Sequence, residues 1–312
     1  MKISDAPLVS ILINNYNYGR FLTEAVDSAL NQTYDKVEVI VVDDGSTDNS
    51  HEIIASYGDK IRAIIKPNSG QASAFNTGFA ASHGEIICFL DSDDIFLSNK
   101  VTEIVNVFKA DEDIGWCFHV LNFFGNTQKK FELDNQKWTS GKYDLRSTIQ
   151  GGKLDGRMPQ VNLATSTMCF KAELLKQILP MPEIIKITSD DYIKYIALGL
   201  MPGFVLIKEL AMQRIHDNNA YTLRTDGDKQ KLAAKINILT ADSMKSNFPE
   251  ILSKFSNNIF AKSISIYLLN GGIEAESKKV VNCYMSLLSL PDKIEVYIRI
   301  FYNYLKYRYV KP

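Results

Sequence analysis

Several hallmarks of other protein classes are missing from this sequence of 312 residues. Its four cysteines are scattered without a CxxC pair, so neither a zinc site nor a disulfide framework is indicated. Basic and acidic residues almost cancel, at 35 and 36. The chain therefore lacks the positive field that attracts proteins to nucleic acid, and we expect no nucleic-acid partner.

Long hydrophobic runs and a secretory leader are also missing. No apolar run approaches the roughly 20 residues that a membrane-spanning helix needs. The first apolar stretch is interrupted at Asn14 and Asn15, so it does not form the core of a signal peptide. With reduced thiols as well, we expect a cytoplasmic protein whose membrane contact, if it has one, is at the inner face.

Glycine-rich phosphate loops are the third absence. The segment 14–19, which follows the first apolar run, contains neither GxGxxG nor a glycine-rich loop with Arg and Lys. This argues against a nicotinamide dehydrogenase and against a nucleotidyltransferase that forms sugar nucleotides.

What the sequence does contain is a regular alternation of buried strands and amphipathic helices. Apolar runs predict strands at 9–13, 37–42, 61–65, 86–90, 116–124 and 167–170. Helical spacing predicts helices at 21–30, 50–57, 71–82, 99–108, 171–178 and 190–198. Strands that are apolar on both faces and alternate with helices are typical of an α/β fold with a mainly parallel central sheet flanked by helices.

The second part of the chain has a different character. Residues 125–160 are polar without a sustained period, and beyond residue 226 the pattern is helical without strand candidates. We therefore predict an α/β domain at 1–225 and a smaller all-helical domain at 226–312. The final segment, 294–312, is rich in tyrosine and basic residues, and two interpretations are open: it packs on the helical domain, or it lies on a membrane surface.

Carboxylates follow the predicted strand at 86–90. Asp91, Asp93 and Asp94 would be delivered together to the edge of a sheet, where their burial and mutual repulsion favour a cation. Oxygen ligands of this kind suit Mg²⁺ or Mn²⁺. A helix cap is the structural alternative, but one aspartate would satisfy a cap.

A second acidic cluster, Asp43 and Asp44, follows the strand at 37–42. Asp, Gly, Ser and Thr are also ordinary turn residues, so this motif alone is ambiguous. A carboxylate at a strand end can accept hydrogen bonds from a nucleobase, and Tyr16 on the neighbouring loop could stack on the base.

Four motifs in order closely resemble the family-2 glycosyltransferases of the GT-A fold. They are the segments Val9–Asn17 and Val41–Asp48, the pair Asn68-Ser69-Gly70 with Asn76-Thr77-Gly78, and Asp91-Ser92-Asp93-Asp94. The resemblance covers residues 7 to about 220. Because four motifs share order and spacing, it is far more specific than any one of them.

The resemblance implies a donor site for a nucleotide-diphosphate sugar. Asn14 and Tyr16 would touch base and ribose, Asp44 would hydrogen-bond the base, and Asn76 would shape the donor pocket. Asp93 would be the main metal ligand of a DxD motif, with Asp91 supporting the metal or the ribose. The metal would be Mn²⁺ or Mg²⁺.

The resemblance also implies which residues take part in the reaction itself. Asp191, in the place of a family Glu-Asp pair, would be the general base, although Asp190 stands where the family usually has Glu. Arg214 and His216 match a late Arg-x-His segment, and alternation would put both on one side, toward the diphosphate or the metal. Caps and surface pairs are the structural alternatives.

The sequence therefore predicts an inverting, hexosyltransferase-type enzyme that uses a UDP-sugar by default. The acceptor would be a hydroxyl of a glycan or lipid-linked glycan in polysaccharide synthesis, by resemblance only. A non-catalytic module that binds a nucleotide sugar or a glycan on the same fold is the alternative.

Overall fold

The computed structural model describes residues 3–126, 139–154, 158–159, 163–217, 219 and 227–309. It divides into two compact units, one of Met1–Leu145 with Gly156–Asn219 and one of Arg146–Asp155 with Ala220–Pro312. The sequence did not indicate that residues 146–155 group with the later helices. The predicted boundary at 225/226 stays a prediction, since residues 220–226 lie outside the described part.

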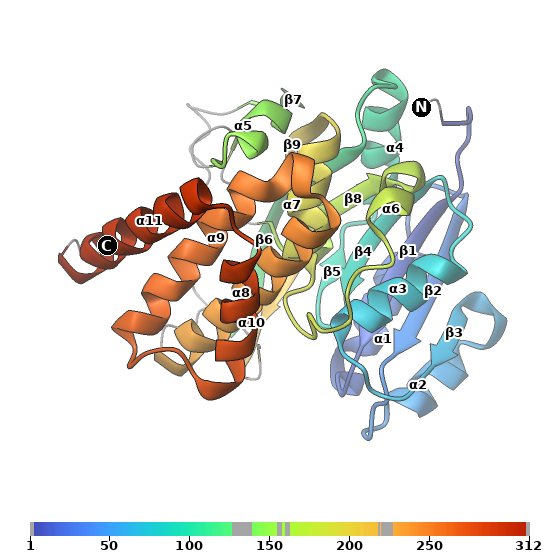
Figure 1. The fold of residues 1–312 in the computed structure, drawn as a ribbon. Helices are drawn as coiled ribbons and strands as arrows, with labels where there is room; N and C mark the ends of the chain where they lie inside the picture. Colours follow the sequence, from blue (N-terminus) through green and yellow to red (C-terminus); the bar gives the residue numbers. More distant parts are fainter. Residues whose placement is uncertain are drawn as a thin grey trace. The chain divides into compact units, whose positions relative to one another are not determined.

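The first unit is built on one sheet (Figure 1). Its described strands are β1 (Val9–Asn15), β2 (Val37–Asp43), β3 (Arg62–Ile65), β4 (Ile86–Asp91), β5 (Ile95–Phe96), β6 (Trp116–Gly125), β7 (Gly141–Tyr143), β8 (Met168–Lys171) and β9 (Gly203–Ile215). They are ordered β3-β2-β1-β4-β8-β6-β9-β5, with β7 paired to β9.

The sheet is parallel in its first half and mixed in its second. Strands β3, β2, β1 and β4 pair in parallel, as the alternation of strands and helices predicted. Strand β8 then pairs antiparallel with β4 and β6, while β9 runs parallel to β6. The sequence did not reveal β9, because Lys208 and Glu209 are exposed and interrupt its apolar pattern.

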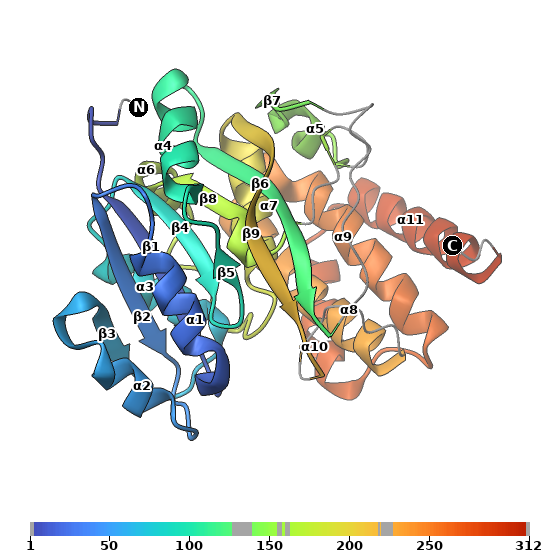
Figure 2. The ribbon, with the colours of Figure 1, turned by 180° about the vertical axis from the view of Figure 1, so that it is seen from behind.

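Helices cover both faces of this sheet. The helices are α1 (Gly19–Leu30), α2 (Ser50–Ser56), α3 (Gln71–Ala81), α4 (Lys100–Ala110), α6 (Ala172–Ile178) and α7 (Asp190–Leu200), with short 3-10 turns at Gly58–Lys60 and Thr165–Thr167. Helices α1, α2 and α4 lie on one face and α3, α6 and α7 on the other (Figures 1 and 2). In α1 the residues at helical spacing, Leu22, Ala25, Val26 and Ala29, are fully buried.

The parallel strands bring the polar loops to one edge. Asn14 is the sheet partner of Asp91, and Asn15 is the partner of Asp43. The ends of β1, β2 and β4 therefore meet, which is where ligands bind in open α/β sheets.

The second unit is helical in its described residues. It contains α5 (Arg146–Gln150), α8 (Gly227–Asn247), α9 (Pro249–Leu269), α10 (Ala275–Ser286) and α11 (Leu290–Tyr309). In its core Phe260 and Tyr284 stack with ring centroids 4.0 Å apart. The segment after α5 is tied to α9, since Asn258 Nδ2 donates to the Gly152 carbonyl at 3.1 Å. None of the described helices combines the length and the hydropathy that crossing a bilayer would require.

Candidate functional site

Three carboxylates occupy the end of β4, as the sequence predicted. Burial first, and then the charges of Asp93 and Asp190, raise the pKa of Asp91 well above its usual range. Burial also raises the pKa of Asp93, against the opposing effect of His216. A cation would offset this concentration of negative charge. Within the described ranges, however, no three His, Cys, Asp or Glu side chains are already arranged as a metal site.

The third carboxylate, Asp94, has a structural role. It is almost fully buried and accepts hydrogen bonds from Ser166 Oγ at 2.7 Å and from the Arg214 backbone N–H at 3.0 Å. Ser166 Oγ also accepts a bond of 3.1 Å from the Asp91 backbone N–H. The Thr165–Thr167 turn thus holds the backbone of the DxD segment.

A buried lysine forms a hydrogen bond to the backbone of this turn. Lys100 is fully buried, and its Nζ donates to the Ser166 carbonyl at 2.8 Å while lying 3.2 Å from the ring centroid of Phe96. Burial lowers the pKa of Lys100. Sequence reasoning missed Lys100 and Ser166, because a lysine in an amphipathic helix is ordinarily a surface residue.

His216 and Asp93, both predicted metal ligands, lie side by side. His216 Nε2 is 3.0 Å from Asp93 Oδ2. The imidazole is held between the Tyr18 and Phe21 rings, with centroids at 5.5 and 4.8 Å. The Asn219 side chain accepts from the His216 N–H at 2.5 Å, which fixes the turn. The pair is therefore positioned from three segments distant in sequence.

The Arg214 side chain also contacts the DxD segment, but at the backbone carbonyl of Asp93 and not at a carboxylate. Its Nε donates to the Asp93 carbonyl at 3.1 Å, and its guanidinium lies 2.9 Å from Glu24 Oε1. The guanidinium carbon is 4.6 and 4.3 Å from the ring centroids of Phe21 and Phe124. Its predicted contact with the diphosphate stays a prediction.

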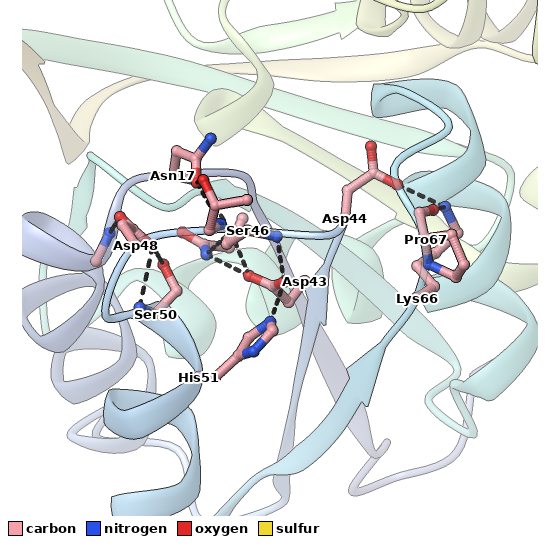
Figure 3. A network of polar contacts seen from close by, with 12 residues as sticks. Asn17, Asp43, Asp44, Ser46, Asp48, Ser50, His51, Lys66 and Pro67 are labelled. Carbon is pink, nitrogen blue, oxygen red and sulfur yellow. Dashed lines mark hydrogen bonds and ion pairs between the residues drawn. The ribbon is translucent and has the colours of Figure 1, made fainter.

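The two aspartates at the end of β2 point in different directions (Figure 3). Asp43 is fully buried and accepts bonds from Asn15 at 2.7 Å, from Ser46 Oγ at 2.6 Å and from the Ser46 N–H at 2.8 Å. His51 Nε2 lies 2.9 Å from Asp43 Oδ1, the oxygen that also accepts from the Ser46 N–H. Burial alone would raise the pKa of Asp43, but these hydrogen bonds outweigh it and lower the pKa. Asp43 is therefore a structural anchor.

Asp44 faces the loop before α3. Its carboxylate lies 2.5 Å from Lys66 Nζ and accepts from the backbone N–H groups of Ser69 at 3.0 Å and Gly70 at 2.7 Å. The predicted bond to a nucleobase would therefore have to share or displace these donors. The contacts hold the 66–70 loop against the end of β2.

Asn14 carries an unusual amide, while Tyr16 is open to solvent. Both the nitrogen and the oxygen of the Asn14 side chain are buried without a hydrogen-bond partner among the described residues. Buried polar groups are normally satisfied, so this amide beside Asp91 is available to a ligand. The Tyr16 side chain is 48% exposed, as stacking on a base requires.

Asn76 makes a backbone clamp. Its Nδ2 donates to the Met181 carbonyl at 2.9 Å, and its Oδ1 accepts from the Met181 N–H at 2.8 Å. As it stands, this amide fixes the 179–189 loop to α3. Its predicted part in the donor pocket would thus be indirect.

The two aspartates that open α7 also differ. Asp191 forms an ion pair with Lys194, one turn further along the helix. Asp190 is buried, and burial followed by the charge of Asp191 raises its pKa to about 6. The charge of Asp190 in turn contributes to the raised pKa of Asp91. Sequence reasoning chose Asp191 and did not single out Asp190.

Comparison with known proteins gives a consistent result. The family model described as glycosyl transferase family 2 matches residues 10–169, about half of the chain. A glycosyltransferase of Rickettsia prowazekii is 45% identical over 92% of this chain and 86% of its own length. One from Nostoc is 36% identical over 68% of this chain and 66% of its own, so the match spans slightly under two thirds of that relative.

Solved structures share the fold. TarS of Staphylococcus aureus, in complex with UDP-GlcNAc, superposes with a TM-score of 0.64 at 16% identity, covering 96% of this chain and 91% of TarS. A Pyrobaculum calidifontis mannosyltransferase in complex with GDP-Man and Mn²⁺ has a TM-score of 0.52 at 16% identity, covering 99% and 89%. The likeness confirms the predicted GT-A fold with its helical C-terminal region.

Proposed function

We propose that this chain, which belongs to glycosyl transferase family 2, moves a sugar from a nucleotide-diphosphate donor to an acceptor hydroxyl with inversion. UDP-sugars are the first donors to consider, since TarS, which shares the fold, forms a complex with UDP-GlcNAc. The acceptor we propose is a glycan or lipid-linked glycan in cytoplasmic polysaccharide synthesis. The observation that carries the proposal is the unsatisfied, buried amide of Asn14 beside the partly buried carboxylate of Asp91.

The side chains at the end of β4 are suitable ligands for a divalent metal. Asp91 and Asp93 end a buried strand, their pKa values are raised, and His216 touches Asp93. Oxygen and imidazole ligands of this kind accept Mn²⁺ or Mg²⁺, and Mn²⁺ occurs in the complex of the mannosyltransferase with the same fold. We propose that Asp93, Asp91 and His216 would hold the ion, which supplies positive charge to offset the departing diphosphate.

The protein's own residues prepare the donor. The exposed Tyr16 ring offers a face to the base, and the Asn14 amide offers a donor and an acceptor to ribose or base. Asp44 holds the 66–70 loop and is proposed to share its carboxylate with the base N–H. Asn76 supports the same pocket by fixing Met181.

A carboxylate at the start of α7 removes the acceptor proton. Asp191 is the proposed general base, and its partner Lys194 holds the carboxylate in place. Asp190 is the second candidate, because a pKa of about 6 suits proton transfer near neutral pH. In either case the acceptor oxygen attacks the anomeric carbon opposite the leaving diphosphate, so the configuration inverts and no enzyme nucleophile is needed.

Donor hydrolysis tests the proposal without knowledge of the acceptor. Purified protein would be incubated with UDP-, GDP- and dTDP-sugars, with Mn²⁺ or with chelator, and release of the nucleotide measured. We expect metal-dependent release that Asp191→Asn reduces by about a hundredfold or more. If Asp190→Asn has the larger effect, the base is Asp190. Donor binding without turnover, unchanged in both variants, would instead favour the non-catalytic binding module.

A further inference from the structure

Exposed apolar side chains are concentrated on α11. Of the fourteen large hydrophobic side chains that are exposed among the described residues, eight lie on this one helix. They are Leu290, Ile294, Tyr297, Ile298, Phe301, Tyr302, Leu305 and Tyr309. Scattered exposed apolar residues are ordinary, but a contiguous set marks an interaction surface.

These eight residues form one continuous stripe. They recur every three or four positions, so at about 100° per residue they occupy one side of the helix. The opposite side is already used: Val296 is fully buried in the core of the second unit, and Ile300 packs against the same core. Figures 1 and 2 show α11 lying along α9. Helix α11 is therefore apolar on two sides, and among the described residues of the second unit only the side of Val296 and Ile300 packs against the core.

The charge of α11 is positive, in contrast to the chain. It has four basic residues, Lys293, Arg299, Lys306 and Arg308, against Asp292 and Glu295, which leaves +2, whereas the whole chain carries −1. Arg299 is paired with Glu295 at 2.7 Å, and Ser289 Oγ donates to Asp292 at 2.7 Å. Because the charges of Asp292 and Lys293 offset each other, the excess positive charge resides on Lys306 and Arg308, near the C-terminal end of α11.

This distribution of charge favours an anionic surface over a second copy of the chain as the occupant. In a parallel two-fold dimer Lys306 and Arg308 would meet the same residues of the other copy, and in an antiparallel dimer they would meet Lys293 beside Asp292, which together carry no net charge. Anionic lipid headgroups offer the opposite sign to Lys306 and Arg308. The exposed rings of Tyr297, Tyr302 and Tyr309 combine an apolar body with a polar tip, which suits the boundary between headgroups and acyl chains.

We propose that α11 binds the surface of an anionic lipid bilayer through this stripe, with the helix parallel to the membrane plane. Its apolar side chains enter the acyl boundary, and Lys306 and Arg308 contact the phosphates. The proposal requires neither a donor sugar nor turnover, so it stands or falls separately from the proposed function.

Vesicle co-sedimentation of the full-length protein tests this. Wild-type protein should bind phosphatidylcholine vesicles that contain phosphatidylglycerol and bind pure phosphatidylcholine vesicles much more weakly. Ile298→Glu with Phe301→Glu should reduce the partition coefficient by about tenfold or more, since charge replaces inserted apolar surface. Leu268→Glu, at an exposed position on α9, is the matched control and should bind like wild type.

A second pair of variants tests the electrostatic part at exposed positions. Lys306→Glu with Arg308→Glu should lower binding to anionic vesicles by about tenfold, whereas Lys279→Glu on α10 should not. Wild-type protein that ignores anionic vesicles would overturn the proposal. So would a dimer that Ile298→Glu with Phe301→Glu dissociates without a change in vesicle binding. A melting temperature lowered by that double variant but not by Leu268→Glu would show that the stripe is covered within the protein, which also contradicts the proposal.

Discussion

The side-chain carbonyl of Gln71 accepts a hydrogen bond of 2.9 Å from the backbone N–H of Ser189. These residues are 118 positions apart, and Ser189 directly precedes the helix that begins with Asp190. The Gln71 N–H in turn donates to the Lys186 carbonyl at 2.8 Å. The loop held by Asp44 is thereby joined to the helix that carries the candidate bases.

Gln71→Ala should therefore lower kcat more than it affects KM for the donor. We expect kcat to fall by about tenfold, because small displacements of a reacting group are costly. Steady-state kinetics with a donor identified by the hydrolysis screen would measure the split. Gln71→Glu keeps an acceptor oxygen at the same place and should recover most of the rate. Equal loss in both variants would argue against positioning through Ser189.

Asp93→Ala should abolish Mn²⁺-dependent binding of the nucleotide, and His216→Gln should weaken it by about tenfold. The reason is that Asp93 and His216 are in contact and Asp93 is the proposed main ligand. Isothermal calorimetry with UDP, with and without Mn²⁺, would measure this. Asp59→Ala, at an exposed carboxylate, is the control. Affinity that still depends on Mn²⁺ in Asp93→Ala would rule out the assignment.

The carboxylates at the strand ends could be predicted because apolar runs locate strands, and parallel strands end at a common edge. Asp91 and Asp93 were found in this way, whereas Asn14 came from the family resemblance. Their supports could not be predicted. Lys100 has the spacing of a surface residue, and its burial depends on Ser166, which is 66 positions away.

The roles within each acidic pair were also beyond sequence reasoning. Asp43 and Asp44 are adjacent and of one type, but one points to His51 and the other to Lys66. The choice between Asp190 and Asp191 depends on burial and on Lys194 in the same way. Such differences arise from tertiary packing, which cannot be deduced from the local sequence pattern.

Asp190→Asn should stabilise the protein at pH 7.5 and not at pH 4. Burial raises the pKa of Asp190 from 3.8 to about 6, so the folded state binds a proton more tightly than the unfolded state. The stabilisation from that proton is full below pH 3.8 and is lost as pH rises through 6. The neutral amide avoids this loss, by on the order of 1–3 kcal/mol.

Urea unfolding of wild type and variant at the two pH values would measure the difference. Asp191→Asn is the control, since it breaks the ion pair with Lys194 and should not stabilise at pH 7.5. An Asp190→Asn variant that is equally destabilised at both pH values would contradict the expected burial of charge.

Asp43→Asn and Asp44→Asn should separate folding from binding. Asp43→Asn should lower the free energy of unfolding at pH 7 by about 1–3 kcal/mol, because a buried acceptor of several hydrogen bonds is impaired. Since the pKa of Asp43 is lowered, its stabilising effect is present above pH 3.8 and is lost as pH falls below that value. Denaturant unfolding of wild type and Asp43→Asn at pH 7 and at a pH below 3.8 would test this.

Asp44→Asn should mainly weaken nucleotide binding, by about tenfold, since it loosens the loop at Ser69 and Gly70. Calorimetry with UDP would measure the effect. If Asp43→Asn weakens binding more than Asp44→Asn at equal stability, the roles of the two residues are reversed.

The grouping of residues 146–155 with the C-terminal helices affects how the chain is made. During synthesis, α5 leaves the ribosome about a hundred residues before α9, against which it packs. Until α9 emerges, Ile149 has no core to enter, although it is fully buried in the finished protein. Residues 146–155 therefore remain without their packing partner while the sheet unit folds. A shortened chain that ends at Asn219 would leave the loop permanently without its partner, so the sheet unit and the C-terminal helices are best produced together.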